Sequence, residues 1–379
     1  MRNVPHLRFP EFTEEWKRKR FKDVCNITTG NKNTQDKSDD GIYPFYVRSQ
    51  IVERINSWTF DGEAILTAGD GVGVGKVFHY STGKIGVHQR VYILSDFKCD
   101  GKYLYSYFAG NFYNRVKRMS AKSSVDSVRM EMIADMPISL PSNEEQKKIG
   151  HLLALLDERI ATQNKIIEKL QSLIKGLNDS LYDRYGDGIR TSFAELGYSY
   201  SGLSGKSAMD FGKGKPFITY LNVYSNNVVN ENEYQYVQID EGEKQNVVQY
   251  GDVLFTLSSE TPEEVGIGSV YLGQDEVYLN SFCFGIHIVN EELAYSPYIS
   301  YYVSSTPFRK FIYPFAQGST RFNLCKADFE KASITLPSLD NQKRIHSVLN
   351  SVAMKISTER AMLEQYVTQK QHLLHQMFI

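Results

Sequence analysis

The sequence has few cysteines and lacks long hydrophobic runs. Its four cysteines, Cys25, Cys99, Cys283 and Cys325, never form a Cys-x-x-Cys pair, which argues against a zinc cluster and predicts free thiols in a reducing cytoplasm. No run of about 18 apolar residues occurs, and the first ten residues, MRNVPHLRFP, lack the apolar stretch of a signal peptide. We therefore expect neither a membrane span nor a secretory signal. The 379 residues, 41% hydrophobic and 23% charged, suffice for two or more ordinary globular domains.

Positive charge is scarce in the second half of the chain. Residues 1–190 contain 29 Lys and Arg against 24 Asp and Glu, a net +5, whereas residues 191–379 contain 14 against 20, a net −6. Between Pro216 and Phe308 the one basic residue is Lys244. Because phosphate neutralisation supplies most non-specific affinity for DNA, a DNA-binding role must account for this acidic half.

The glycine-rich stretch GDGVGVGK, residues 69–76, lacks the anchors of a nucleotide site. A phosphate-binding P-loop needs Ser or Thr after Gly-Lys and a glycine five positions earlier, but Val77 and Asp70 stand there. A dinucleotide fingerprint needs a following helix, whereas the strand-like KVFHY follows. The stretch reads as a loop between two strands.

Other catalytic and metal motifs are also missing. No Asp/Asn/Ser-Pro-Pro-Tyr/Phe motif, post-strand S-adenosylmethionine loop or Gly-x-Ser-x-Gly elbow occurs. Asp135 with Glu145-x-Lys147 resembles a nuclease metal site, but Glu145 also fits a helix-capping role. His372 and His375 share a helical spacing without a third ligand nearby. We predict no catalytic residue, metal or cofactor in this chain.

An internal repeat organises the sequence. MPISLPSNEEQKKIGHLLALLDERI (136–160) aligns without gaps with ASITLPSLDNQKRIHSVLNSVAMKI (332–356), at an offset of 196 residues. Weaker similarities between the copies precede these segments: YPFYVRS (43–49) resembles KPFITYL (215–221), and KSSVDSV (122–128) resembles GSTRFNL (318–324). The chain therefore consists of two diverged copies of one unit.

The well-matched part of each copy is predicted to be a long helix. Ser142 and Glu145 form a capping-box pattern after Pro141, and apolar residues then recur every three or four positions. The seam comprises Ile149, Leu153, Leu156, Ile160, Gln163, Ile167 and Leu170 in the first copy, and Ile345, Leu349, Val352, Ile356, Glu359, Leu363 and Tyr366 in the second. Because the polar entries Gln163 and Glu359 coincide, we expect the helices to pair and the polar pair to fix their register.

The remainder of each copy reads as short strands with one helix. Strands are expected at EAILTAG, KVFHYST and RVYILSD, and again at GDVLFTLS, GSVYLG and SFCFGIHIV. Helices are expected at 100–119 and 296–311. The predicted class is α+β, with two pseudo-symmetric mixed domains separated by two long paired helices. The expected bounds are 1–142 and 183–337 for the domains, and 143–182 and 338–379 for the helices.

This organisation resembles the specificity (S) subunit of type I restriction–modification enzymes. The resemblance spans the chain and is carried by HLRFPEFTEEW (6–16), the two Leu-Pro-x-x-x-x-Gln segments and GSTRFNL (318–324). It implies two target-recognition domains, each reading half of a bipartite double-stranded DNA site, and two antiparallel helices serving as spacer and docking surface. It also implies two methyltransferase (modification) subunits carrying S-adenosylmethionine, and restriction subunits using ATP and Mg²⁺.

The resemblance makes loop residues the candidates for DNA contact. In the first domain these are Arg48, Ser49, Lys76, His88, Gln89, Arg90, Lys122, Ser123 and Ser124, and in the second Tyr220, Asn222, Ser258, Ser259, Asn280, Ser281, Ser319, Thr320 and Arg321. The glycines of residues 69–76 would let backbone approach DNA, with Lys76 on a phosphate. Two alternatives stay open: a coiled-coil scaffold that does not read DNA, and a self-contained enzyme, which the missing motifs disfavour.

Overall fold

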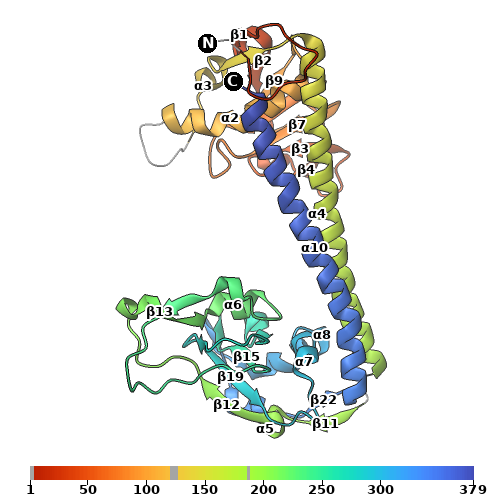
Figure 1. The fold of residues 1–379 in the computed structure, drawn as a ribbon. Coiled ribbons are helices and arrows are strands. Elements are labelled where there is room, and N and C mark those ends of the chain that lie inside the picture. The colour runs from red at the N-terminus through yellow and green to blue at the C-terminus, as the bar shows by residue number, and fades with distance from the viewer. Residues whose placement is uncertain (1–3, 120–126, 186–187) are drawn as a thin grey trace. The chain divides into compact units, whose positions relative to one another are not determined.

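The computed structural model describes residues 4–119, 127–185 and 188–379. It confirms an α+β chain in which two β-rich domains are joined to two long helices that contact each other (Figure 1). By internal contacts the chain divides into an N-terminal unit, Met1–Lys165 with Ala361–Ile379, and a second unit, Ile166–Arg360. None of the helices in the described ranges combines the length and the hydrophobicity that a membrane span requires.

The N-terminal unit contains two four-stranded sheets. The first is antiparallel, in the order β2 (Asn26–Thr29), β9 (Val91–Ser95), β6 (Ala64–Ala68) and β7 (Phe78–Ser81). The second has the order β4 (Glu53–Ile55), β3 (Tyr43–Tyr46), β8 (Lys84–Val87) and β5 (Phe60–Asp61), in which β3 and β8 run parallel. The unit also contains β1 (Lys17–Arg20), which pairs with β10 (Pro137–Leu140), and the helices α1 (Phe21–Val24), α2 (Gly101–Met119), α3 (Met130–Ala134) and the start of α4 (Asn143–Tyr185).

The second unit repeats the first of these sheets and, without a fourth strand among its described residues, the second. Its antiparallel sheet has the order β12 (Gly197–Ser201), β19 (Cys283–Ile288), β15 (Val253–Thr256) and β17 (Gly268–Val270). A second sheet consists of β14 (Gln235–Val237), β13 (Phe211–Ile218) and β18 (Tyr278–Leu279), with β13 and β18 parallel, and a third of β16 (Ser258–Ser259), β21 (Phe322–Leu324) and β20 (Ala316–Gln317). β11 (Ile189–Thr191) pairs with β22 (Ile334–Leu336), and the helices are α5 (Phe193–Leu196), α6 (Tyr220–Ser225), α7 (Ser296–Tyr302), α8 (Thr306–Ile312), α9 (Lys326–Lys331) and α10 (Leu339–Met377).

The helix expected over 296–311 is two helices. α7 ends at Tyr302, and α8 begins with Thr306 and Pro307 after the N-cap Ser305, whose side chain accepts from the Phe308 N–H. Proline lacks an N–H and disfavours helical geometry in the residue before it, so it fits the first turn of a new helix better than the interior of a continuous one. The expectation of one helix was therefore wrong.

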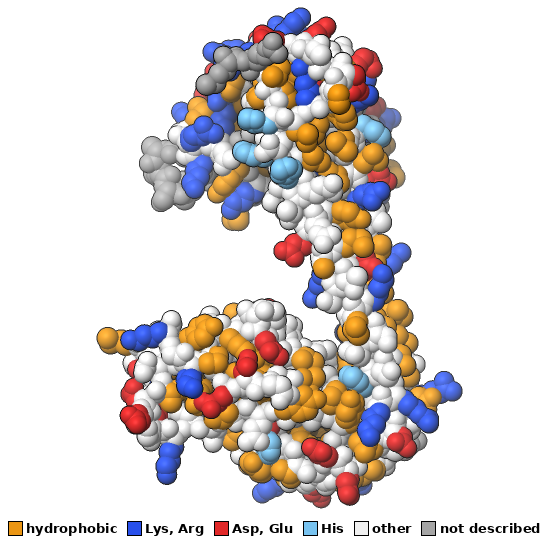
Figure 2. Space-filling model, viewed as in Figure 1, with side chains coloured by type: hydrophobic (Ala, Val, Ile, Leu, Met, Phe, Trp, Pro, Cys, Tyr) orange, Lys and Arg blue, Asp and Glu red, His pale blue; other side chains and the backbone are white. Residues whose placement is uncertain are grey.

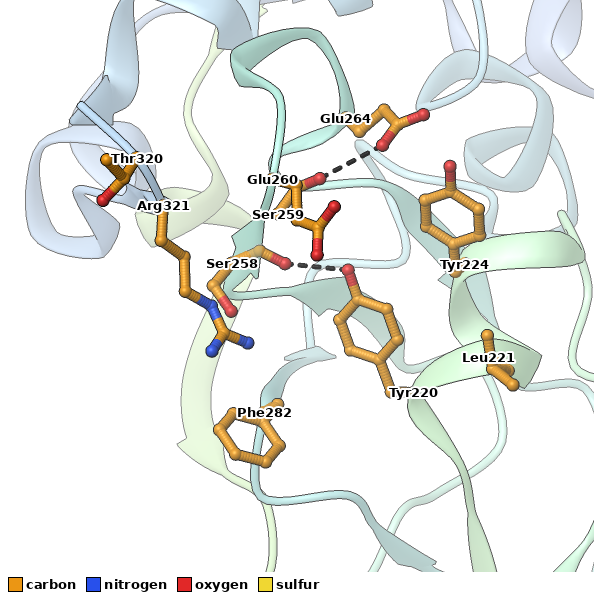
Figure 3. Close-up of a pocket in the computed structure, with 10 residues that line it drawn as sticks. All are labelled: Tyr220, Leu221, Tyr224, Ser258, Ser259, Glu260, Glu264, Phe282, Thr320 and Arg321. Carbon is orange, nitrogen blue, oxygen red and sulfur yellow. Dashed lines mark hydrogen bonds between the residues drawn. The ribbon is translucent and has the colours of Figure 1, made fainter. Parts of the chain in front are cut away.

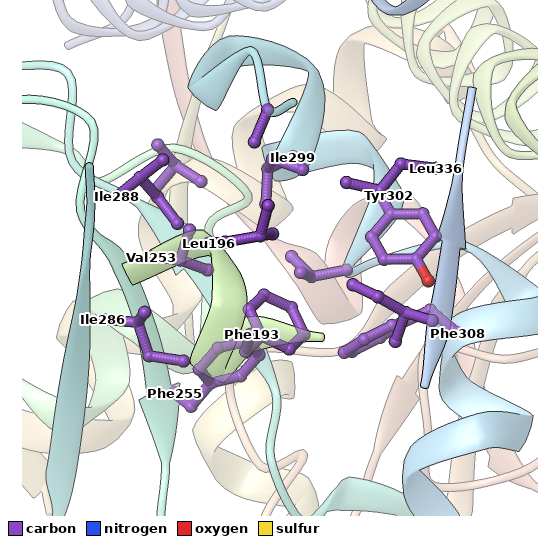
Figure 4. Close-up of a cluster of buried hydrophobic side chains, with 14 of the residues drawn as sticks. Phe193, Leu196, Val253, Phe255, Ile286, Ile288, Ile299, Tyr302, Phe308 and Leu336 are labelled. Atoms are coloured by element: carbon purple, nitrogen blue, oxygen red, sulfur yellow. The ribbon is translucent and has the colours of Figure 1, made fainter. Parts of the chain in front are cut away.

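The start of each long helix is part of the core of a unit. Ile149 and Leu153 of α4 are buried with Phe21, Tyr103 and Phe108 in the N-terminal unit. Ile345 and Leu349 of α10 join a cluster in the second unit whose largest members include Phe193, Phe255 and Phe308 (Figure 4). Burying each such side chain contributes about 1.5–3 kcal/mol, so each helix start is anchored in its domain.

The glutamine of the Leu-Pro-x-x-x-x-Gln segment makes equivalent hydrogen bonds in the two copies. Gln146 donates to the Pro141 carbonyl (2.8 Å) and accepts from the Asp100 N–H (3.0 Å). Gln342 likewise donates to the Pro337 carbonyl (2.8 Å) and accepts from the Tyr295 N–H (2.8 Å). Each buried amide therefore satisfies backbone groups at the point where the long helix meets its domain.

The seam of α4 and α10 is buried or half-buried at all fourteen predicted positions, including the polar Gln163 and Glu359. In the N-terminal unit the two helices run antiparallel and side by side (Figure 1). Asp157 forms an ion pair with Lys370, and the Arg159 guanidinium lies 5.9 Å from the centroid of the Tyr366 ring. The role of Gln163 and Glu359 in fixing the register stays a prediction.

Candidate nucleic-acid interface

In the N-terminal unit, three charged residues meet where strands of both sheets end. Arg48 follows β3, Asp70 follows β6, and Arg90 precedes β9. Arg48 Nη1 lies 2.8 Å from Asp70 Oδ1, and Arg90 Nε lies 3.6 Å from Asp70 Oδ2. Two predicted DNA-binding arginines are thus brought together by a carboxylate that the sequence analysis did not select.

The other predicted residues of this unit differ in accessibility. His88 is 5% exposed, its Nδ1 accepts from the Arg90 N–H (3.0 Å), and burial lowers its pKa. Gln89 donates to Asn33 Oδ1 (2.7 Å), and the Ser49 hydroxyl donates to the Ile51 carbonyl (3.0 Å). His88 is thus placed to hold the backbone of Arg90. The candidates Lys122, Ser123 and Ser124 lie outside the described residues.

The glycines of residues 69–76 serve close packing and turn geometry. Gly71 and Gly75 have φ angles of +79° and +67°, values that residues with a side chain rarely adopt. A Cβ on Gly73 would lie 2.4 Å from the Arg48 carbonyl oxygen. Lys76 is exposed, with its Nζ 5.7 Å from the centroid of the Tyr113 ring. The glycine loop therefore packs directly beside Arg48.

In the second unit, predicted residues line a cavity of about 740 Å³ (Figure 3). Tyr220, Ser258, Ser259, Thr320 and Arg321 belong to its lining. The Tyr220 hydroxyl donates to the Ser258 carbonyl (2.7 Å), while the Arg321 guanidinium lies over the Phe282 ring, 5.8 Å from its centroid. The lining also contains Leu221, Tyr224, Glu260, Glu264 and Phe282, which the sequence analysis missed.

The remaining candidates of this unit do not line the cavity. Asn222 is fully buried, and its amide bonds the Asn230 carbonyl and N–H (both 2.9 Å), so it is not placed to contact a ligand. Asn280 Oδ1 accepts a hydrogen bond from the Phe282 N–H (2.9 Å) and thereby positions the backbone of Phe282, whose side chain lines the cavity. Ser281 and Ser319 are exposed.

Acidic side chains, Glu260 and Glu264, belong to the lining of this cavity. Glu264 accepts from the Ser259 hydroxyl (3.2 Å), and a hydrogen bond from Tyr224 lowers the pKa of this carboxyl, so it stays ionised near neutral pH. Arg309 donates to the carbonyls of Glu263, Val265 and Gly266 (2.7 Å each) and thereby clamps the loop that carries Glu264. Acidic and hydrophobic side chains appear together on the face of this unit drawn in Figure 2.

The two constellations occupy equivalent places in the repeated fold. Tyr46 pairs with Val87 in the parallel strands of the N-terminal unit, as Ile218 pairs with Leu279 in the second. Ala68 likewise pairs with Val91, as Thr256 pairs with Cys283. Counting outward from these pairs matches Arg48 with Tyr220, Asp70 with Ser258, and Arg90 with Phe282.

The nuclease-like residues are engaged in structural ion pairs. Glu145 is fully buried and bonds Arg8 through both carboxylate oxygens (2.7 and 2.8 Å). Asp135 pairs with Arg20 (3.0 Å) and Lys22 (2.8 Å), which lower the pKa of its carboxyl. Within the described part of the chain, no group of three or more His, Cys, Asp or Glu side chains could hold a metal ion.

Comparison with known proteins assigns the family. The sequence model of one protein family, described as the type I restriction modification DNA specificity domain, matches residues 13–172 and 206–367. Since these two matches cover most of the chain, the protein belongs to this family of specificity subunits, the non-catalytic component of type I restriction–modification systems.

Two sequence relatives agree with that assignment. The chain is 29% identical over 161 residues to the type I restriction enzyme EcoDI specificity subunit of Escherichia coli, covering 42% of this chain and 35% of the relative. It is 26% identical over 318 residues to the putative MjaX specificity subunit of Methanocaldococcus jannaschii, covering 77% and 67%. Its match thus spans about a third of the E. coli relative's length.

Two solved structures show the same fold. The S subunit of the M. genitalium type I system superposes with a TM-score of 0.64 at 14% identity over 99% of both chains. A structure from work on complex assembly and conformational transition of the type I system superposes with a TM-score of 0.55 at 13% identity, over 96% of this chain and 97% of the other.

Proposed function

We propose that this chain recognises a bipartite DNA target, with each domain reading one half. The observation that carries the proposal is the equivalence of two constellations on a duplicated fold, Arg48–Asp70–Arg90 in one copy and the Tyr220–Ser258–Phe282 cavity in the other. Shared placement with different chemistry is what two readers of different sequences require. Family membership supports the same function.

The long helices complete the proposed division of labour. We assign residues 1–142 and 183–337 to the recognition domains, and 143–182 and 338–379 to paired helices that separate them and dock two methyltransferase subunits. S-adenosylmethionine, ATP and Mg²⁺ belong in this proposal to the methyltransferase and restriction subunits. The acidic second domain fits this arrangement, because the basic domain and the methyltransferase subunits would supply the missing phosphate contacts.

Domain exchange tests the proposal. Replacing residues 188–337 by those of a relative with a different target should change one half of the methylated motif and leave the other half intact. The readout is the methylated sequence in cells that express the chimaera with the methyltransferase subunit. A change in both halves would contradict independent reading, and no DNA binding by the intact complex would favour the scaffold alternative.

Arg321→Ala should weaken DNA binding by the assembled complex. Arg321 is exposed beside Phe282 in a domain with few cations, so its loss should remove one phosphate contact and reduce the salt dependence, the slope of log K against log salt, by about one unit. Lys310→Ala is the control, because Lys310 is exposed on α8 and does not line the cavity. An unchanged slope in folded Arg321→Ala protein would assign Arg321 to a protein contact.

A further inference from the structure

The carboxylate between Arg48 and Arg90 is shared by two accessible guanidinium groups. The side chains of Arg48 and Arg90 are 47% and 65% exposed, against 28% for Asp70. Each oxygen of the carboxylate faces a different arginine, so one negative charge is set against two positive charges. The cluster therefore keeps a net charge of +1 and unused N–H donors.

Asp70 itself is held by backbone pairing. The Gly69 N–H donates to the Arg90 carbonyl (2.8 Å), the Val128 N–H donates to the Gly69 carbonyl (2.8 Å), and Asp70 forms a β-bridge with Ser127. Among the described residues, Asp70 is the one charged partner of Arg48. A carboxylate fixed in this way orients the planar guanidinium and leaves its other edge free for a ligand.

The chemistry of the cluster favours a base edge over a phosphate. A phosphate bound by Arg48 would lie close to the Asp70 carboxylate, and two anions in one place repel each other. The equivalent positions of the second unit, Tyr220, Ser258 and Phe282, carry no charge. Base contacts differ between two half-sites that have different sequences, so a position whose charge differs between the two copies fits base reading.

We infer that Arg48, oriented by Asp70, reads a guanine in the half-site of the N-terminal domain. The free edge of the guanidinium donates to guanine O6 and N7 in the major groove, the pairing that a planar fork of donors suits. Asp70 acts as a positioning residue. This inference rests on the proposed function, and adds to it that the first half-site contains a G·C pair and that the second is read differently at the equivalent place.

A modified duplex tests the inference on the unaltered protein. Once methylome mapping gives the target, each guanine of the first half-site is replaced in turn by 7-deazaguanine, which removes N7 and keeps base pairing and phosphates. At one position the wild-type complex with its methyltransferase subunits should lose about tenfold or more in affinity. A first half-site without guanine, or no loss at any guanine, would overturn the inference while sequence-specific binding, and with it the proposed function, still stood.

Variants test whether Arg48 is the residue that contacts this guanine. Arg48→Lys keeps the charge but not the planar fork of donors, so it should bind more weakly and be less sensitive than wild type to 7-deazaguanine at that position. Asp70→Asn should bind unrelated DNA more tightly and discriminate less, an outcome that a purely structural role would not give. Arg20→Lys is the matched control, because Arg20 pairs with Asp135 at 3.0 Å outside the cluster and should keep full discrimination. An Arg48→Lys complex with the wild-type response would exclude Arg48 as the reader.

Discussion

Arg8→Ala is expected to lower the free energy of unfolding of the N-terminal unit by about 3–5 kcal/mol, because it leaves a buried charge without its partner. Glu145 is fully buried, and both its oxygens accept from Arg8, which is 13% exposed. Both tryptophans of the chain, Trp16 and Trp58, belong to this unit, so intrinsic tryptophan fluorescence during urea unfolding reports on it alone.

Two controls separate buried charge from the loss of a contact. The double variant Arg8→Leu with Glu145→Leu should recover most of the stability, since replacing a whole buried ion pair by apolar side chains is often neutral or better. Arg20→Ala breaks a pair whose side chains are 57% and 40% exposed, and should cost about 1 kcal/mol or less. An Arg8→Ala protein as stable as Arg20→Ala would mean that water reaches Glu145.

The sequence predicted the elements better than their partners. The heptad seam and the six selected strand segments were found because side-chain periodicity is local information. The parallel pairing of β3 with β8 joins residues about 40 positions apart, and no local pattern encodes that partner. The break between α7 and α8 could have been predicted, since Pro307 stands in the expected helix.

The sequence analysis selected arginines and small polar residues that the structure brings together, but not the groups that position them. Asp70 was noticed as a failed P-loop anchor, and its role depends on Arg48 and Arg90 arriving from other strands. Phe282 could have been selected as a candidate, because it is an aromatic residue directly after the selected Ser281. Asn222 gave a misleading signal, because a loop asparagine has the same composition whether it faces solvent or, as here, holds the Asn230 backbone.

Lengthening both long helices should change the spacing of the recognised DNA sequence. If the paired helices hold the recognition domains apart, their length sets the gap between the two half-sites. Four residues inserted after Gln163, with four more after Met362, add about 6 Å of helix to each partner. Neighbouring base pairs are about 3.4 Å apart, so the gap in the methylated motif should grow by one or two base pairs.

The insertion sites follow from the antiparallel contacts of the N-terminal unit. Asp157 meets Lys370 and Arg159 meets Tyr366, which places Gln163 opposite the Met362 region. Four residues form a stutter that locally unwinds a coiled coil and keeps its seam. Inserting two residues at each site instead turns the seam by about half a turn and should abolish methylation, because Ile167 and its neighbours would face water. A four-residue variant that methylates the original spacing would show that DNA bending or domain movement, and not helix length, sets the gap.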